Sequence, residues 1–309
     1  MVKAGDGDVL SSQKLTITPI QAGYQALFFA MGSPCEIQIR SVLPPERSRQ
    51  LLVDCYHEAS RIEKKYSRYR CDNLVSQMNS ATRVQVDEET HRLLDYADHC
   101  YRASSGLFDI TSGVLRRFWR FDGNSTTLEP DESAIQDVLS CIGWDRVYWE
   151  APWFQLPPQM EIDFGGIAKE YAVDRVALYL KDRDLDQILV NFGGDLAVYT
   201  SDSQRYEPWT VGIEQPHAHG QAAQSVSLYN GALATSGSTH RYCRINDRIY
   251  GHILNPKTGY PVEDAPLSVT TFSDTCTQAG MLSTFAMLHG RAAEPFLQAQ
   301  QVPSWVIRP

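Results

Sequence analysis

The order in which helical and strand-like patterns follow one another most constrains the fold of this 309-residue chain. Residues 44–67 start with prolines and then place apolar residues on one helical face, and residues 88–104 repeat this spacing before Gly106. Helical patterns also cover 165–184 and 275–290. Because these helices are intermixed with strand-like segments and show no regular βαβ order, the sequence predicts an α+β fold with a mostly antiparallel sheet and flanking helices.

The expected strands are short and are interrupted by glycine or proline. The first, 25–40, breaks at Met31-Gly32, and 188–200 breaks at Gly193-Gly194. The other expected strands are 145–150, 153–156, 161–164, 208–214, 225–237, 247–254, 267–273 and 304–308.

Nothing in the composition divides the chain into separate domains. Residues 1–22 begin polar and Gly-rich and are expected to form a flexible arm, whereas residues 23–309 contain no linker or internal repeat and are expected to form one domain. No apolar run approaches the roughly 18 residues of a membrane helix, and the N-terminus lacks the apolar centre of a secretory signal. We therefore expect a cytoplasmic protein without a membrane segment, or a periplasmic one if a leader has been removed.

The charge argues against a nucleic-acid binder, and the cysteine content argues against a secreted protein built on disulfides. The net charge of -9 disfavours a nucleic-acid binder, which normally has a basic face, but it leaves room for a phosphate-bearing ligand in a local positive pocket. The seven cysteines are odd in number and form no CxxC, so free thiols in a reducing compartment are expected. Cys276 lies at a helix start, a position that could lower the pKa of its thiol. A small structural residue at the start of the helix is the plainer interpretation.

The stretch "DFGGIAKEYAVD" (163–174) has the features of an anion site. Two glycines allow close approach to the backbone, and the helix that follows presents unpaired N–H groups and the positive end of its dipole. A pyrophosphate would fit there, with Lys169 as an added point charge. An ordinary tight turn into a helix would have the same residues. No generic nucleotide-binding motif favours the anion site over such a turn.

Three other stretches carry polar groups suited to chemistry, each with a structural alternative. "NFGGDL" (191–196) is either a bulge or close backbone crossing, or a wall that packs on a flat ligand or on the first glycine turn. In "GHILNPKTGYPV" (251–262), His252 is a candidate acid or base or a structural histidine. In "AGMLSTFAML" (279–288), the two hydroxyls at 283 and 284 either bond back to the helix or bind a hard cation such as Mg²⁺.

The succession of motifs is more specific than any one of them. The stretches "MGSPCEI", "YSRYRCDNLVSQMN", "GLFDITSGVL", "DFGGIAKEYAVD", "LVNFGGDL", "HILNPKTGYP" and "AGMLSTFAML" occur in this order. Together they closely resemble the ApbE family, the FAD:protein FMN transferases, over about residues 27–300. The "GGIAK…AVD" block of residues 165–174 and the "HILNPKTG" block are the parts most specific to that family.

The resemblance implies a fold and an activity. The fold is a single ApbE-like, T-fold-like domain. The activity is Mg²⁺-dependent transfer of FMN from FAD to a Ser or Thr hydroxyl of an acceptor flavoprotein, with release of AMP. Some members hydrolyse FAD to FMN and AMP instead, and this FAD pyrophosphatase activity stays an alternative.

The resemblance also implies roles for single residues. His252 matches the position of the likely base. FAD contacts are implied for Met31, Tyr69, Leu107, Phe108, Asp109, Gly165, Tyr171 and Leu254, beside the charge of Lys169. Metal ligands are implied at the Ala168 carbonyl, Ser283 and Thr284.

Three positions depart from the family pattern. Gly280 stands where an Asp metal ligand is typical, Glu170 where many members have Gly, and Asn255 where Asp is usual. Because Mg²⁺ is commonly held by one or two carboxylates, we hypothesise that Glu170 replaces the missing one. Complementing the helix dipole is an equal alternative for Glu170, and Asp274 is a weaker candidate ligand. If nothing replaces the lost carboxylate, a non-catalytic FAD-binding protein with a degenerate metal site is the third function to consider.

Overall fold

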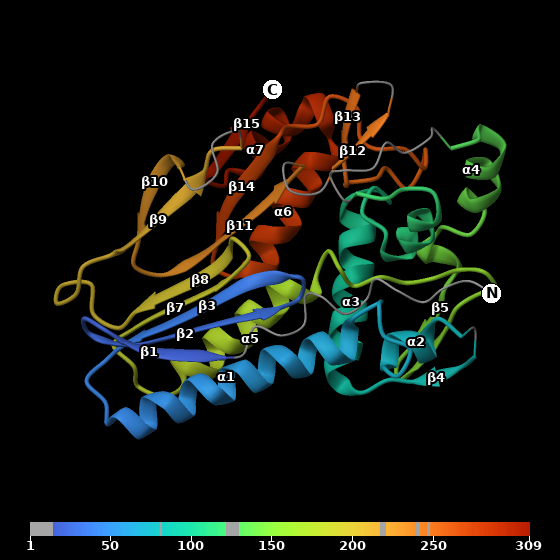
Figure 1. Cartoon of the computed structure of the whole chain (residues 1–309). Coiled ribbons are helices and arrows are strands. Elements are labelled where there is room, and N and C mark those ends of the chain that lie inside the picture. The colour runs from blue at the N-terminus through green and yellow to red at the C-terminus, as the bar shows by residue number, and fades with distance from the viewer. Residues whose placement is uncertain (1–14, 81, 122–129, 217–220, 239–241, 246–247) are drawn as a thin grey trace.

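The computed structural model describes residues 15–80, 82–121, 130–216, 221–238, 242–245 and 248–309 (Figure 1). The α-helices are α1 (Pro45–Tyr66), α2 (Leu74–Met78), α3 (Glu88–Ala103), α4 (Glu132–Leu139), α5 (Ala168–Lys181), α6 (Cys276–Leu288) and α7 (Ala293–Gln300). Short 3-10 helices are η1 (Ile110–Arg117), η2 (Trp144–Arg146) and η3 (Gly290–Ala292). The strands are β1 (Thr16–Ile20), β2 (Gly23–Ala30), β3 (Ser33–Arg40), β4 (Val84–Gln85), β5 (Tyr148–Glu150), β6 (Trp153–Gln155), β7 (Gln187–Phe192), β8 (Asp195–Thr200), β9 (Trp209–Glu214), β10 (Ala222–Leu228), β11 (Gly231–Gly237), β12 (Tyr242–Ile245), β13 (Arg248–Gly251), β14 (Ser268–Ser273) and β15 (Ser304–Ile307).

The main sheet has eight strands in the order β1-β2-β3-β7-β8-β11-β14-β15. Every neighbouring pair in it is antiparallel. The prediction of an α+β fold with an antiparallel sheet is thereby confirmed. Smaller sheets are β9-β10, β12-β13 and β4-β6-β5.

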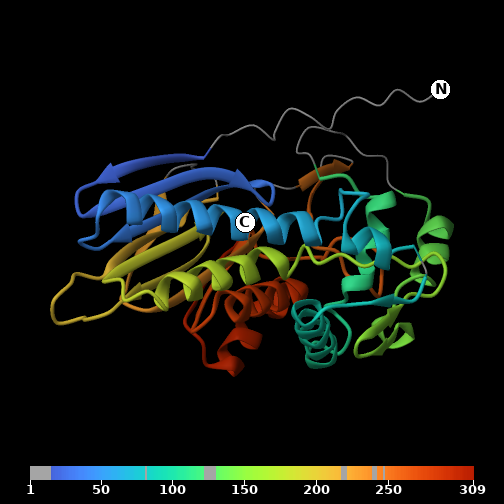
Figure 2. The same cartoon turned by 90° about the horizontal axis from the view of Figure 1, so that it is seen from below.

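Three long helices lie side by side on one face of the main sheet (Figures 1 and 2). Helix α1 packs on β2, α5 on β7 and β8, and α6 on β11 and β14. Helix α5 lies between the other two and contacts both. The opposite face packs around Leu189, Leu196, Val198 and Leu233, together with Trp209 of β9.

Helix α1 shows how the sequence pattern produces this packing. Its apolar stripe, Leu51, Leu52, Cys55, Ala59 and Ile62, is buried as its spacing predicts. Full burial of an aliphatic side chain stabilises a fold by about 1.5–3 kcal/mol. The helix is therefore held by its core-facing side, and prolines at its start supply the fixed φ of the first turn.

Two local expectations are wrong. Within the arm expected over residues 1–22, residues 16–20 form β1 and pair with β2, while residues 1–14 lie outside the described residues. Residues 161–164 form no strand; they lead into a turn, and α5 begins at Ala168 and not at residue 165. The backbone of this segment forms hydrogen bonds with a side chain and not with another strand, because the Asn79 amide bonds to both the N–H and the C=O of Ile162.

The cysteines and the helices agree with the expectations of free thiols and of no membrane helix among the described residues. The seven cysteines are thiols, and all but Cys71 are buried. Among the described residues, none of the helices combines the length and apolar character that crossing a lipid bilayer requires.

Candidate active site

The glycine pair forms a tight turn directly before α5. The Gly165 N–H donates to Asp163 Oδ1 at 2.9 Å, and the N–H groups of Ile167 and Ala168 donate to the Phe164 carbonyl at 2.9 and 2.8 Å. Phe164 is fully buried and holds the turn in place. Several amides of this stretch are thus already paired, while Gly165 and the following Gly166 are both exposed to an incoming ligand.

Asp163 connects the turn to two distant motifs, a role that sequence analysis missed. Its carboxylate forms an ion pair with Arg68, and its N–H donates to the Ile110 carbonyl at 2.8 Å. Arg68 also donates to the Tyr69 hydroxyl at 2.8 Å, and Tyr69 itself is 81% exposed. An acidic residue two positions before Gly165 was the available signal for this link.

The "GLFD" segment reaches the glycine turn through Phe108. An added Cβ at Gly166 would lie 3.2 Å from the Phe108 ring, so a glycine permits this close packing. On its other side Phe108 meets Phe285 of α6, with ring centroids 6.0 Å apart. Leu107 is half-buried beside it. The structure therefore brings three of the predicted stretches together here.

Asp109 has a structural use in this geometry. Oδ1 accepts hydrogen bonds from the N–H and hydroxyl of Thr111, and Oδ2 accepts from the Trp144 N–H. Burial raises the pKa of Asp109 against the lowering effect of these bonds. Asp109 thus caps η1, and its predicted contact with FAD stays a prediction.

Lys169 lies against an acidic residue and not in open solvent. Its Nζ is 2.6 Å from Oδ2 of Asp195, which is almost fully buried at the start of β8. Burial acts to lower the pKa of Lys169, but Asp195 and Glu170 outweigh it and raise that pKa above its ordinary value. Lys169 is therefore a fixed cation, and Asp195, directly after the second glycine pair, is another residue that sequence analysis missed.

The second glycine pair makes the hairpin between β7 and β8. Gly193 and Gly194 have φ values of 63° and 95°, which favour glycine, and Phe192 pairs with Asp195 across the turn. A Cβ at Gly193 would lie 2.5 Å from Ser33 Cβ and 3.9 Å from Lys169 Nζ. The pair thus forms a hairpin turn that passes close to Ser33 and positions Asp195, and a wall beside a flat ligand or the first glycine turn stays a prediction.

Glu170 is buried and faces α6. Its exposure is 8%, and burial together with the neighbouring Asp195 carboxylate raises the pKa of Glu170 above its ordinary value. A Cβ at Gly280 would lie 2.6 Å from Glu170 Cγ, which places the Glu170 side chain directly over that glycine. Asp274, by contrast, is exposed before the helix begins.

A hydroxyl cluster lies on α6 one turn beyond Gly280. The Ser236 hydroxyl of β11 lies 2.9 Å from Ser283 Oγ and 3.0 Å from Thr284 Oγ1. Ser283 also donates to the Gly280 carbonyl at 3.0 Å, as the structural interpretation of this motif expects. Ser236 is a further residue that sequence analysis missed; the "TSGS" run around it was the available signal.

This donor set has the chemistry of a hard-cation site. Hydroxyl and carboxylate oxygens are ligands that Mg²⁺ prefers, and the role of the Ala168 carbonyl as a further ligand stays a prediction. The described residues hold no group of three or more His, Cys, Asp and Glu side chains arranged for a metal. A cation here would therefore depend on hydroxyl and carbonyl oxygens beside Glu170.

His252 follows β13 directly and is half-buried. Its ring meets Phe121 edge-on at 6.4 Å, and the loop after it is fixed by Trp119 Nε1, which donates to the Gly259 carbonyl at 2.8 Å. Leu254 forms an isolated bridge with Pro261 in the same loop. The loop is thereby anchored on the segment that follows η1.

Two predicted FAD contacts have other contacts in this structure. Met31 adopts a left-handed backbone with φ 54°, and its N–H donates to Glu63 Oε1 at 2.6 Å. The Tyr171 hydroxyl donates to Glu89 Oε1 of α3 at 3.0 Å. Their predicted roles stay predictions.

The start of α6 is capped by α5. Asp174 accepts hydrogen bonds from the N–H groups of Cys276 and Thr277 at 2.7 and 2.8 Å. Burial raises the pKa of the Cys276 thiol well above its ordinary value. The expectation that its helix-start position lowers this pKa is wrong, because burial and then the carboxylates of Asp195, Asp174 and Glu170 raise it.

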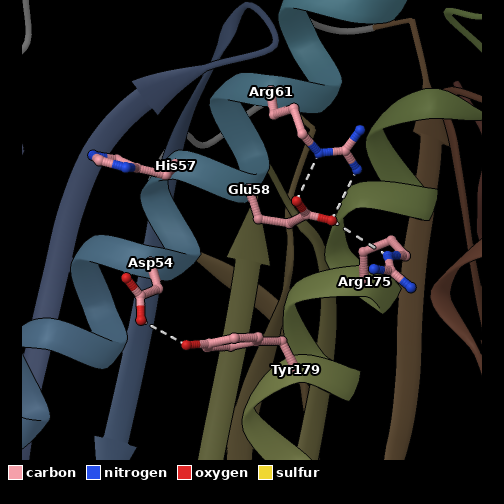
Figure 3. A pocket seen from close by; sticks show the side chains of 6 residues that line it. All are labelled: Asp54, His57, Glu58, Arg61, Arg175 and Tyr179. Atoms are coloured by element: carbon pink, nitrogen blue, oxygen red, sulfur yellow. Dashed lines mark hydrogen bonds and ion pairs between the residues drawn. The ribbon is translucent and has the colours of Figure 1, made fainter.

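Two of the pockets among the described residues bear on the site. One of about 450 Å³ is lined by Gly106 and Asp109 on one side and by Pro256 and Lys257 on the other, so it joins two predicted stretches. Its volume lies within the range of small-molecule pockets, about 300–1,000 Å³. The other, of about 290 Å³, lies between α1 and α5 (Figure 3) and contains none of the predicted site residues.

Five of the six side chains that line the second pocket form ion pairs or hydrogen bonds with one another. Glu58 binds Arg61 at 2.8 Å and Arg175 at 3.3 Å, and Tyr179 donates to Asp54 at 2.6 Å (Figure 3). These contacts tie α1 to α5. The pocket is therefore explained as a helix interface.

Comparison with known proteins gives consistent matches over most of the chain. A model described as the ApbE family matches residues 31–304. A protein of Klebsiella pneumoniae named FAD:protein FMN transferase is 30% identical over 252 residues, 79% of this chain and 75% of that protein. One of the same name from Treponema pallidum is 27% identical over 287 residues, 86% and 79% of the two chains. The crystal structure of the ApbE protein of Thermotoga maritima superposes with a TM-score of 0.80 at 27% identity, covering 95% of this chain and 94% of the other.

Proposed function

The chain belongs to the ApbE family, and on that premise we propose that it transfers the FMN part of FAD to a Ser or Thr hydroxyl of an acceptor flavoprotein, releasing AMP. The observation that carries this proposal is the convergence of an exposed glycine turn, the Phe108 segment and a buried oxygen cluster at the start of α5. Phosphoryl transfer needs mainly positioning and charge neutralisation. The glycine turn would supply the positioning, and a cation bound at the oxygen cluster would supply the charge neutralisation.

The turn at Gly165 and Gly166 is the proposed binding site of the FAD pyrophosphate. Its glycines are exposed, and the positive end of α5 favours an anion there. The predicted FAD contacts at Met31, Tyr69, Leu107, Phe108, Asp109, Tyr171 and Leu254 are proposed to surround the two halves of the dinucleotide, with Lys169 held nearby by Asp195.

A divalent cation, Mg²⁺ in our proposal, would be held by the Ala168 carbonyl and the hydroxyls of Ser283 and Thr284, with Glu170 considered below. When bound, such an ion withdraws electron density from the pyrophosphate and stabilises the leaving group. The protein's own contribution is to fix these oxygens through Ser236 and the α6 backbone.

His252 is the proposed general base. The acceptor hydroxyl oxygen forms a bond to the FMN phosphorus, and its proton passes to His252. The bond from that phosphorus to the bridging oxygen breaks, and AMP leaves with the electron pair. The product is a phosphoester between FMN and the acceptor. We also propose a reducing compartment such as the cytoplasm, which is supported by the seven cysteines present as thiols.

The test follows both products of FAD. The chain is incubated with FAD, Mg²⁺ and the apo form of a protein that carries phosphoester-linked FMN, and AMP is measured by chromatography and bound flavin by fluorescence on a denaturing gel. We expect AMP and a fluorescent acceptor band in equal amounts. Free FMN and AMP without acceptor would identify an FAD pyrophosphatase instead, and tight FAD binding without turnover under any divalent metal would identify a non-catalytic FAD-binding protein.

The His252→Ala variant should lose the transfer step. We expect AMP release to fall about a hundredfold or more, because general base catalysis contributes factors of that size, while FAD binding is retained. The control is His99→Ala, which changes an exposed histidine on α3. Equal transfer rates in the two variants would remove His252 from the mechanism.

A further inference from the structure

Glu170 and Gly280 share one volume. An ideal Cβ at Gly280 would lie 2.6 Å from Glu170 Cγ and 3.1 Å from both Cδ and Oε1. Cβ atoms do not approach other atoms so closely, so a side chain at position 280 and Glu170 in its present position exclude each other. The Glu170 carboxylate can therefore lie over position 280 of α6 only because that residue is a glycine.

The Glu170 carboxylate is placed for a ligand that is not part of the chain. The residue is 8% exposed, and within the described part of the chain Glu170 Oε2 has no hydrogen-bond partner. A buried carboxylate oxygen without a partner is costly and calls for a cation or a donor. The nearest cation, Lys169, is held by Asp195 at 2.6 Å, and the other oxygen of Asp195 accepts from the Thr235 N–H.

Two hydroxyls lie on the face of α6 that carries Gly280. Ser283 and Thr284 follow Gly280 by three and four residues, so their side chains lie on the same side of α6 as the volume filled by Glu170. Ser236 bonds to both hydroxyls from the opposing strand. One carboxylate and several neutral oxygens form the donor set of a small, hard divalent cation.

We propose that Glu170 supplies the carboxylate of the divalent-cation site from the first turn of α5, and that Gly280 is the space required for it. This inference rests on the proposed function, because it concerns the same site. It also makes positions 170 and 280 a coupled pair: a carboxylate can reach the same volume from either helix, but not from both at once.

A competing explanation is that Glu170 complements the dipole of α5. An anionic residue in the first turn of a helix stabilises it by about 0.3–1 kcal/mol. That role would affect the stability of the fold and leave cation binding unchanged. Glu46, an exposed residue in the first turn of α1, has the dipole role without a site, and Glu46→Gln is therefore the matched control.

The experiment measures Mn²⁺ binding by electron paramagnetic resonance of the free ion, with protein alone and with protein saturated with FAD, against a blank of FAD. Loss of residues that merely orient metal ligands weakens affinity about 10–100-fold. We therefore expect Glu170→Gln, which keeps the shape of the side chain, to weaken Mn²⁺ binding at least about tenfold, while Glu46→Gln has no effect. Thermal melts confirm that each variant is folded.

The exchange variant tests the coupling. Glu170→Gly combined with Gly280→Asp moves the carboxylate to α6, and Mn²⁺ affinity should return to within about tenfold of the unaltered protein. Gly280→Ala alone leaves Glu170 present but displaces it, and it should weaken Mn²⁺ binding. Because Glu170→Gln is isosteric, it decides the matter even if the exchange variant folds poorly.

The outcomes separate this inference from the proposed function. If the unaltered protein binds Mn²⁺ and Glu170→Gln binds it equally well, the assignment of Glu170 is wrong and the transferase proposal stands. If the unaltered protein binds Mn²⁺ neither alone nor with FAD, the cation part of the proposed function fails together with the inference.

Discussion

Cys276 lies at the start of α6, where a helix end would favour the thiolate, yet the pKa of its thiol is raised. The residue is fully buried, and both the loss of hydration and the nearby carboxylates of Asp195, Asp174 and Glu170 disfavour the thiolate. Cys35 follows the same rule, since burial raises its pKa to about 12. Single residues of this chain thus take their reactivity from their surroundings in the fold.

Alkylation of the folded protein should therefore be selective. At pH 8, iodoacetamide is expected to modify Cys71 first, because it is the exposed one of the seven cysteines, and FAD binding should survive. Peptide mass spectrometry identifies the modified residue, and protein in urea, where all seven should react, is the control. Early labelling of Cys276 in the folded protein would contradict the assignment.

At the scale of elements, Glu89 joins three helices. From α3 it binds Arg61 and Lys65 of α1, both at 2.6 Å, and accepts a hydrogen bond from Tyr171 of α5. Burial opposes ionisation of this carboxyl, but hydrogen bonds from Arg61 and Lys65 outweigh it and lower the pKa of Glu89 to about 2. These bonds hold α3, and the segments attached to it, against the helical layer.

Glu89→Gln should destabilise the fold near neutral pH. We expect a loss of about 2 kcal/mol in the free energy of unfolding at pH 7, measured by urea denaturation. A folded-state pKa below the unfolded value means that the stabilisation is complete above pH 4.5, the ordinary value, and is lost as the pH falls towards 2. The difference between the two proteins should therefore shrink over that window.

Glu88→Gln provides the control for this prediction. Glu88 is the preceding residue on α3, and its side chain is 69% exposed in its pair with Arg92. Exposed pairs of this kind contribute little. Equal effects of the two substitutions at pH 7 would show that Glu89 is not a connection between helices.

At the scale of the whole molecule, the candidate site lies where two parts of the chain meet. The sheet and its helices contribute Glu170, Asp195 and the α6 hydroxyls, while the region between α1 and α5 contributes Arg68 and Phe108. The two parts meet beside the glycine turn, where the Phe108 ring contacts Phe285 of α6 with centroids 6.0 Å apart. A ligand that spans the turn would contact both parts at once.

FAD should accordingly stabilise the whole molecule more than either half of FAD does. At a hundred times its dissociation constant, a ligand of the folded state adds about 2.7 kcal/mol, which corresponds to a rise of about 5 °C in Tm for a chain of this size. AMP and FMN, each at the concentration used for FAD, are expected to give smaller shifts in a thermal melt. A shift with FMN alone equal to that with FAD would mean that the adenylate half makes no contact.

The sequence by itself determined the fold class, the faces of the main helices and the family, because each depends on periodicity or on the order of motifs along the chain. The stripe of α1 and the turn before α5 are local features that residues 44–67 and 163–174 specify alone. The tertiary structure decided which groups are paired. That Lys169 lies on Asp195, that Asp163 binds Arg68, and that Glu170 fills the space over Gly280 depends on chain segments about 26, 95 and 110 residues apart. Such contacts are set by the packing of helices on a sheet, and this packing has no signature in the spacing of neighbouring residues.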